Sequence, residues 1–337
     1  MGDKTKQNKV QTIHTAESSL SNSSGGALLG LWKSFSAFVR KDFHLLSYIY
    51  TFVFIVIFIF LNYHFKLYNT YIRPSFFDGN SGWIMPLFYA FFYFGTAIPI
   101  FFFQKRYDLL KNKKFYIKSI IIIAAYGFAI GYYSYRQWEF PDLFRIDKLY
   151  LFRVLSQLKA FCFLFLPFLL MKIYIDKDVK GLYGLSRNSK HIRGYLMLFL
   201  MLLPFLIATS FTPDFLKAYP QFQPWLYEGA FNMPTWLYTT IFESVYALDF
   251  VMVELVFRGV LVIGMISLLG PKAVLPMVAM YAAIHFGKPM GETISSIFGG
   301  YILGAFAYET RHIWGGVIVH ILIALTMEIM GFFHYYN

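Results

Sequence analysis

The stretch DFVMVELVFRG, residues 249–259, carries Glu254 four residues before Arg258, and apolar residues surround both. On a helix, side chains four residues apart share a face, so this carboxylate and this guanidinium can form an ion pair. Ionisable groups are costly inside a membrane, where they are usually paired or face a wet cavity. The pair alone fits two interpretations equally, a structural staple between helices and part of a functional site.

The composition of the chain indicates a membrane protein. Of the 337 residues, 58% are hydrophobic and 14% are charged, whereas a soluble domain usually carries about 25% charged residues. Several apolar runs reach the roughly 20 residues that a helix needs to cross a bilayer. The sequence therefore predicts an all-α fold, a polytopic transmembrane helix bundle of about eight or nine membrane helices.

The expected spans follow the apolar runs of the chain. They are residues 45–64, 83–103, 115–133, 152–172, 194–211, 235–268, 273–286, 293–308 and 314–333. The span 235–268 is too long for one ordinary crossing at about 1.5 Å per residue, so it is either tilted or broken into two helices.

The distribution of charge predicts the orientation of the chain. Its formal net charge is +12, but the basic residues gather in short loops between apolar runs, which is typical of membrane topology and argues against a nucleic-acid partner. Loops 104–114 and 172–193 carry five and six Lys or Arg residues, whereas loops 64–82 and 212–234 carry two and one. We therefore predict an integral protein of a bacterial inner (cytoplasmic) membrane, surrounded by the lipid bilayer, with its N-terminus in the cytoplasm.

The chain divides into three parts. Residues 1–40 are polar and predict a flexible cytoplasmic N-terminal tail, although Trp32, Phe35 and Phe38 could form a short interfacial helix. Residues 41–234 predict a set of N-terminal transmembrane helices, and residues 235–337 predict the core that holds the candidate site. The single cysteine excludes a disulfide framework or a thiolate metal cluster.

Two histidines lie in the apolar segments that follow Arg258. His285 ends a short apolar run, four residues after Tyr281, and His320 lies in the middle of the last span. A lone histidine in a membrane helix is more often a packing group than a functional one. Two histidines and a glutamate favour a functional role, because Glu and His together can activate a water and polarise a carbonyl.

The order of these residues resembles a known family. Glu-x-x-Phe-Arg-Gly at Glu254, aromatic-x-x-x-His at His285 and His-x-x-x-small at His320 are similar to the EExxxR, FxxxH and HxxxN motifs of the CPBP family. Its members are CAAX-protease (type II CAAX prenyl endopeptidase-like) and bacteriocin-processing membrane endopeptidases. The resemblance covers about residues 235–333.

The motif residues of the family can be compared with this chain one position at a time, and two positions differ. Glu254 and Arg258 match the second Glu and the Arg of the first motif, while Val253 stands where the family has the Glu that activates water. His285 matches the water-activating His of the second motif. His320 matches the third motif, but Ala324 replaces the Asn that helps to hold the oxyanion.

The resemblance implies an intramembrane endopeptidase that hydrolyses peptide bonds of a membrane-associated protein or peptide in a cavity open to the cytoplasm. We expect Glu254 and His285 to activate water, His320 to support the oxyanion, and Arg258 to keep Glu254 ionised and oriented. No cofactor is required. As an alternative, Glu254, His285 and His320 would ligate a divalent metal if they converge from three helices.

Two other functions stay open at this point. The two departures favour a catalytically degenerate membrane scaffold or immunity protein that keeps the fold. A proton-coupled transporter would use the buried Glu and His as a relay, but it would favour inverted repeats, which the sequence does not display.

Overall fold

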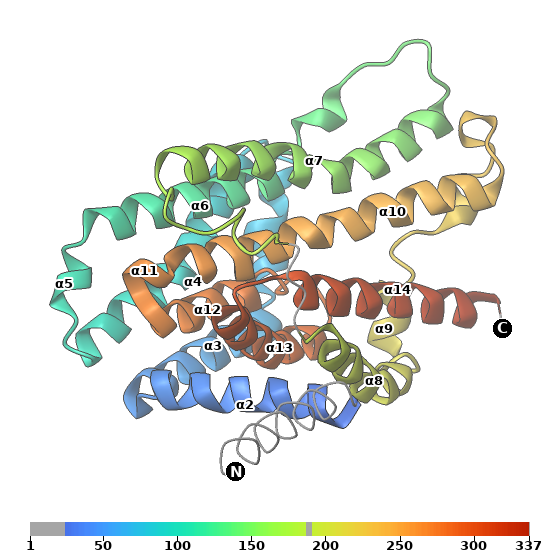
Figure 1. Ribbon diagram of the computed structural model, residues 1–337. Coiled ribbons are helices and arrows are strands. Elements are labelled where there is room, and N and C mark those ends of the chain that lie inside the picture. Colours follow the sequence, from blue (N-terminus) through green and yellow to red (C-terminus); the bar gives the residue numbers. More distant parts are fainter. Residues whose placement is uncertain (1–23, 187–190, 337) are drawn as a thin grey trace, which may run out of the picture.

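The structure is a computed structural model that describes residues 24–186 and 191–336 (Figure 1). Every long element in these ranges is a helix, which confirms the predicted all-α class. The long helices are α2 (Ser24–Asp42), α3 (Leu45–Phe65), α4 (Ser81–Phe103), α6 (Lys113–Gly131), α7 (Arg145–Tyr174), α8 (Ile192–Thr209), α10 (Thr235–Glu254), α12 (Val274–Ala283), α13 (Met290–Thr310) and α14 (Trp314–Tyr336). Short helices α5 (Tyr107–Leu110), α9 (Pro213–Ala218) and α11 (Ile266–Leu269) lie between them.

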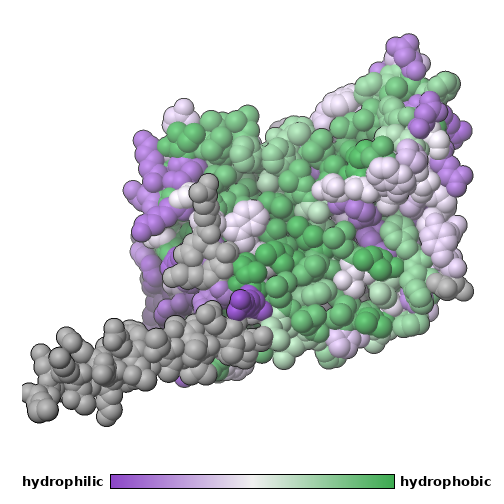
Figure 2. Space-filling view, turned by 45° about the vertical axis from the view of Figure 1, so that its right-hand side comes forward, coloured by the Kyte–Doolittle hydropathy of each residue, from purple (hydrophilic) through white to green (hydrophobic). Residues whose placement is uncertain are grey.

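The outer surface of the bundle is apolar, as a lipid environment requires. Large side chains on α3 and α4, among them Phe60 and Leu87, are more than half exposed. Hydrophobic residues cover the broad middle of the molecule, and hydrophilic ones gather toward two opposite edges (Figure 2). Seven segments of the described ranges are long and apolar enough to cross a membrane. The chain is therefore an integral membrane protein.

The number of crossing segments differs from the eight or nine expected because of the region that holds the candidate site. Residues 235–283 count as one apolar segment of 49 residues. Within it α10 ends at Glu254, a π-helical turn (η6, Leu255–Val260) follows, and a 3-10 turn (η7, Ile263–Met265) leads into α11. The predicted span 235–268 is thus broken. Helix α12 has only ten residues, all buried, and α13 is not among the seven crossing segments.

Helix α2 occupies much of the predicted N-terminal tail. It packs against α8 and α13, with Leu31 and Phe38 buried and Trp32 largely exposed. Residues 24–40 therefore differ from the expected flexible tail, because their apolar residues recur at helical spacing and are buried by neighbouring helices. They fit the alternative of a helix before the first span. The rest of the tail, residues 1–23, lies outside the described residues.

The basic loops 104–112 and 175–186 lie at the same end of the bundle, which we call the basic end. Lys118, at the start of α6, binds Asp176 just after α7 at 2.7 Å and also donates to the carbonyl oxygen of Gly264. Ile313, just before α14, donates its backbone N–H to the carbonyl oxygen of Gly184. The basic end therefore also holds the turn after η6 and the start of α14.

The other end of the bundle, which we call the loop end, holds the loops 66–80, 132–144 and 210–234. The hydroxyl of Ser81, the first residue of α4, donates to the carbonyl oxygen of Gly131, the last residue of α6. In Figure 1 the chain segment before α10 and the C-terminus lie together on the right, and α5 of the basic end lies on the left. The loop end therefore faces away from the basic loops.

Tyr183 fixes the π-helical turn from the basic end. Its side chain is fully buried, and its hydroxyl donates to Asp176 at 2.9 Å. A Cβ added at Gly264 would lie 3.0 Å from the Tyr183 ring, and one added at Gly259 would lie 2.9 Å from the Tyr183 carbonyl oxygen. Two glycines thus let the Tyr183 segment pack directly against the turn that carries Arg258.

Candidate active site

Glu254 and Arg258 form a fully buried ion pair at the end of α10. The Nη1 atom of Arg258 lies 2.9 Å from the Oε1 atom of Glu254, and the two side chains are 1% and 0% exposed. The guanidinium also lies over the ring of Tyr281, 4.2 Å from its centroid. Such a cation–π contact gives a buried cation a second partner. The pair predicted from the sequence spacing is present, but the contact is an ion pair without hydrogen-bond alignment, because none of the guanidinium nitrogens donates a hydrogen bond within the described residues.

His320 joins this pair from α14. Its Nδ1 atom lies 3.1 Å from the Oε1 atom of Glu254. An ionised carboxylate only accepts hydrogen bonds, so Nδ1 carries the hydrogen and Nε2 is left for another partner. The ring of Phe250 packs against the imidazole with centroids 4.4 Å apart. Glu254 therefore fixes both the position and the tautomer of His320.

A glycine brings α14 close to Glu254. Gly316 lies four residues before His320, and a Cβ added there would overlap with the Oε2 atom of Glu254. That oxygen is buried and accepts no hydrogen bond from the described residues. One oxygen of Glu254 is thus engaged by Arg258 and His320, and the other is enclosed against the backbone of α14.

His285 is fixed by a different oxygen. Its Nδ1 atom lies 2.8 Å from the backbone carbonyl oxygen of Tyr281, one helical turn earlier. A carbonyl oxygen is an acceptor, so Nδ1 of His285 also carries the hydrogen and its Nε2 is an acceptor in the neutral ring. Thr293 donates to the carbonyl oxygen of His285 at 2.7 Å. The imidazole is therefore held from both its ring and its backbone.

The turn after His285 is attached to α3. Asn62 donates to the carbonyl oxygen of Phe286 at 3.0 Å, and Tyr63 donates to that of Lys288 at 2.7 Å. Both residues lie in the last turn of α3, next to the loop 66–80. These bonds place the His285 turn near the loop end of the bundle.

Tyr281 brings the predicted residues together. Its ring centroid lies 4.9 Å from that of His285 and 6.4 Å from that of His320. The guanidinium of Arg258 covers the same ring. Three of the four residues predicted from the sequence therefore lie around one aromatic side chain, and Glu254 joins them through Arg258 and His320.

The structure does not arrange these residues as a metal site. Among the described residues, no group of three or more His, Cys, Asp and Glu side chains could hold a metal ion. Glu254, His285 and His320 therefore do not form a ligand set in this conformation, and the metal alternative has no geometric support.

Apolar packing occupies the two positions that depart from the family motifs. Val253 packs against the main hydrophobic core. Ala324 is buried in a second cluster that includes Tyr246 and Phe250.

Three residues that belong to this region were not singled out by the motifs. Gly316 could have been noted from its spacing of four to His320. Lys288 lies three residues after His285 and pairs with Glu292 at 3.2 Å. Asp249 is partly exposed although it lies inside an apolar helix. The sequence offered no signal for this grouping, because it depends on how α10, α14 and the turn after α12 meet.

The comparisons with known proteins concern this same region. Residues 228–326 match the model of the family described as type II CAAX prenyl endopeptidase Rce1-like. No curated protein and no solved structure matches the chain. The matched segment contains both histidines and the Glu254–Arg258 pair, and it includes Val253 and Ala324. The match confirms the resemblance seen in the three motifs: over residues 228–326 the chain carries the pattern of the Rce1-like type II CAAX prenyl endopeptidases.

Proposed function

We propose that this protein is an intramembrane endopeptidase that hydrolyses peptide bonds of membrane-associated proteins or peptides. One observation carries the proposal. Two imidazoles, one in the turn after α12 and one on α14, are each fixed through Nδ1–H and lie against Tyr281 beside a buried Glu–Arg pair. The family match over residues 228–326 supports the same class of reaction.

His285 acts as the general base in this proposal. Its Nδ1–H is held by the Tyr281 carbonyl, so Nε2 accepts a proton from a water molecule. The water oxygen attacks the peptide carbonyl carbon, and the carbonyl oxygen becomes an oxyanion. When the carbon–nitrogen bond breaks, the proton on Nε2 passes to the leaving amine. The reaction thus needs no covalent enzyme intermediate.

His320 stabilises the oxyanion in this proposal. Its Nδ1–H bond to Glu254 orients the ring, and when the ring carries a second proton its Nε2–H can donate to the developing negative charge. Arg258 holds the same carboxylate oxygen of Glu254 from the other side of the pair. The geometry favours this positioning role for Glu254 over the water activation expected from the sequence, because both of its oxygens are already enclosed.

Hydrolysis of a membrane-anchored fluorogenic peptide by the purified protein in lipid vesicles tests this assignment. We expect His285→Ala to lower the rate by about 10²–10⁴-fold, the usual contribution of a general base. His334→Ala is the matched control, because His334 lies on α14 near its end and contacts Ser210 outside the site. Equal rates for wild type and His285→Ala would rule out the mechanism.

A catalytically silent scaffold is the second candidate, favoured by the apolar packing at Val253 and Ala324. The two functions differ in what they demand of His320. A scaffold keeps its partner binding and its stability in His320→Ala, whereas the peptidase loses turnover. Restored biological activity with His320→Ala, in cells that lack the wild-type protein, would favour the scaffold.

A further inference from the structure

A pocket at the loop end is lined by aromatic side chains and, among the described residues, by one charged group, the Arg73 guanidinium. We propose that this pocket binds the phosphate of an anionic phospholipid, with the acyl chains along the exposed faces of α3 and α4. The ligand is a phosphate diester whose head group carries no amine. The inference does not depend on the proposed peptidase function.

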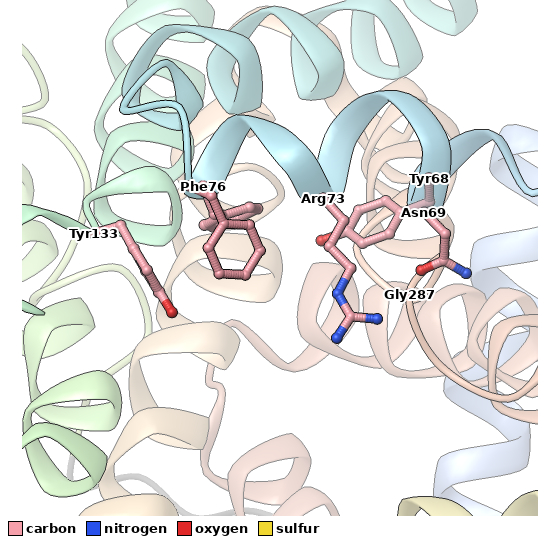
Figure 3. A pocket seen from close by; sticks show the side chains of 7 residues that line it. Tyr68, Asn69, Arg73, Phe76, Tyr133 and Gly287 are labelled. Carbon is pink, nitrogen blue, oxygen red and sulfur yellow. The ribbon is translucent and has the colours of Figure 1, made fainter. Parts of the chain in front are cut away.

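The pocket lies between the loop after α3 and the loop after α6. It has a volume of about 360 Å³, within the roughly 300–1,000 Å³ that is typical of small-molecule sites. Figure 3 shows the Arg73 guanidinium projecting into this space, with Tyr68 beside it and Phe76 and Tyr133 farther along. The rings of Phe76 and Tyr133 meet edge to face with centroids 5.8 Å apart, so the two loops form one aromatic wall.

The Arg73 guanidinium is available to an anion. None of the described residues that line the pocket carries a carboxylate, and Arg73 makes no hydrogen bond or ion pair within the described ranges. A guanidinium presents parallel N–H donors that match two oxygens of a phosphate. The amide of Asn69 lines the same pocket and adds neutral donors. An amine on the head group would face the guanidinium without a carboxylate partner, so the lining favours a head group without a positive charge.

The pocket lies at the depth where the apolar surface of the bundle ends. Phe65, the last residue of α3, and Trp83, near the start of α4, are 56% and 80% exposed. Tyr71 and Phe77, in the loop between these helices, are exposed aromatic residues as well. Exposed Trp and Tyr side chains gather where membrane helices reach the lipid head groups. The Arg73 guanidinium therefore lies at the level of the phosphates, and a lipid fits this position better than a soluble anion does.

Hydrogen bonds attach the pocket to the turn after His285. Gly287 lines the pocket, and a Cβ added there would lie 2.8 Å from the ring of Tyr68. Asn62 donates to the carbonyl oxygen of Phe286 and accepts the backbone N–H of Tyr68, both at 3.0 Å. A ligand in the pocket therefore contacts both the loop after α3 and the turn that carries His285.

Lipid binding to the purified full-length protein tests the proposal. The protein in a neutral detergent is titrated with phosphatidylglycerol, phosphatidylcholine or inorganic phosphate, bound lipid is counted by native mass spectrometry, and the thermal midpoint is measured at each step. We expect phosphatidylglycerol to bind and to raise the thermal midpoint more than phosphatidylcholine or inorganic phosphate does. Arg73→Gln should weaken the binding of phosphatidylglycerol by about 10–100-fold, the usual contribution of a hydrogen bond to a charged group.

Lys66→Gln is the matched control, because it removes the same charge from the same loop and Lys66 does not line the pocket. Its affinity for phosphatidylglycerol should stay close to that of the wild type, and without lipid both variants should unfold at the wild-type temperature. Equal binding by wild type and Arg73→Gln would overturn the proposal. Equal binding of phosphatidylcholine would refute the anionic head group. Equal stabilisation by inorganic phosphate, or displacement of the lipid by a soluble acidic peptide, would refute the lipid.

Hydrogen exchange locates the bound lipid without any measurement of activity. In the turn beside the pocket, the backbone N–H groups of Phe286 and Lys288 donate to the carbonyl oxygens of Ala283 and His285. Phosphatidylglycerol should slow exchange in residues 68–77 and 286–288 of the wild type and of Lys66→Gln, because a ligand that binds the folded pocket suppresses its local opening. The same lipid should leave these segments of Arg73→Gln unchanged. Slowing confined to other segments would place the lipid elsewhere and refute the assignment.

Discussion

At the scale of single residues, one carboxylate organises the candidate site. Glu254 holds Arg258 through an ion pair and His320 through its Nδ1–H, and the Arg258 guanidinium covers Tyr281. The spacing of Glu254 and Arg258 predicted their pairing. The contact with His320 was not predictable from spacing, because it depends on Gly316 letting α14 approach closely.

Gly316→Ala tests this close approach. The added methyl group would overlap with Oε2 of Glu254, so α14 must move or the carboxylate must rotate away from His320. We expect peptide hydrolysis to fall at least tenfold, and the free energy of unfolding to fall by about 1–3 kcal/mol, as is typical of overpacking. Gly299→Ala is the control, because a Cβ there meets nothing within 4 Å. Equal activity in the two variants would contradict the role of Gly316.

Tyr281 variants test the aromatic ring that the site surrounds. Tyr281→Phe keeps the ring under the Arg258 guanidinium, whereas Tyr281→Leu removes it. A desolvated cation–π contact contributes about 2 kcal/mol. We expect Tyr281→Leu to lower both the thermal midpoint and the hydrolysis rate, and Tyr281→Phe to stay close to wild type. A loss of the same size in Tyr281→Phe would assign the effect to the hydroxyl.

At the scale of elements, buried ion pairs and hydrogen bonds fix the helices that carry the site. Lys118 of α6 binds Asp176 after α7 and the carbonyl oxygen of Gly264 before α11. Tyr183 binds the same aspartate. This network connects three segments that are far apart in the sequence. It packs against the π-helical turn from the basic end of the bundle.

Lys118→Met tests the network. It leaves the carboxylate of Asp176 buried without its cation, which usually costs about 3–5 kcal/mol. Lys41→Met removes a more exposed pair with Glu309, whose lysine side chain is 54% exposed, and such pairs contribute about 0–1 kcal/mol. Thermal unfolding in detergent should therefore show a much larger drop for Lys118→Met. Comparable drops in both variants would count against a structural role for the network.

Asp42 gives the junction between α2 and α3 a pH-dependent stability. Burial raises the pKa of the Asp42 carboxyl from 3.8 to about 6, although the hydrogen bond from Tyr48 opposes the shift. Because the folded state binds the proton more tightly, the stabilisation is complete below about pH 4 and is lost as the pH rises through about 6. Thermal midpoints measured between these values should fall with pH more steeply in wild type than in Asp42→Asn. Identical slopes would contradict the assignment.

At the scale of the whole molecule, the fold class followed from the sequence and the arrangement of the site did not. The length of the apolar runs predicted the helical bundle. A segment that crosses lipid must hydrogen-bond its own backbone N–H and C=O groups, and a helix does so. The break after Glu254 was only one of two alternatives, since helix length alone does not show where a chain turns. The packing of the turn after Glu254 depends on Tyr183, which comes from a distant segment of the chain.

The loop before α10 lies at the loop end of the bundle, and Glu328 attaches it to α14. The Glu328 carboxylate accepts the backbone N–H groups of Gln221 at 2.8 Å and Phe222 at 3.1 Å. Glu328→Gln has a single acceptor oxygen, so one of these N–H groups loses its partner, at a cost of about 1.5–3 kcal/mol. The loop should then open at least tenfold more often. Limited proteolysis from the loop end should cut residues 219–232 faster in this variant.

The matched control is Glu228→Gln, which removes an exposed carboxylate from the same loop. It should leave the cleavage rate unchanged. If Glu328 also keeps the loop over the site, Glu328→Gln will alter the KM for a membrane-anchored peptide more than kcat, because the His285 and His320 contacts are untouched. A change confined to kcat would place Glu328 in the chemistry, and unchanged proteolysis would show that other contacts hold the loop.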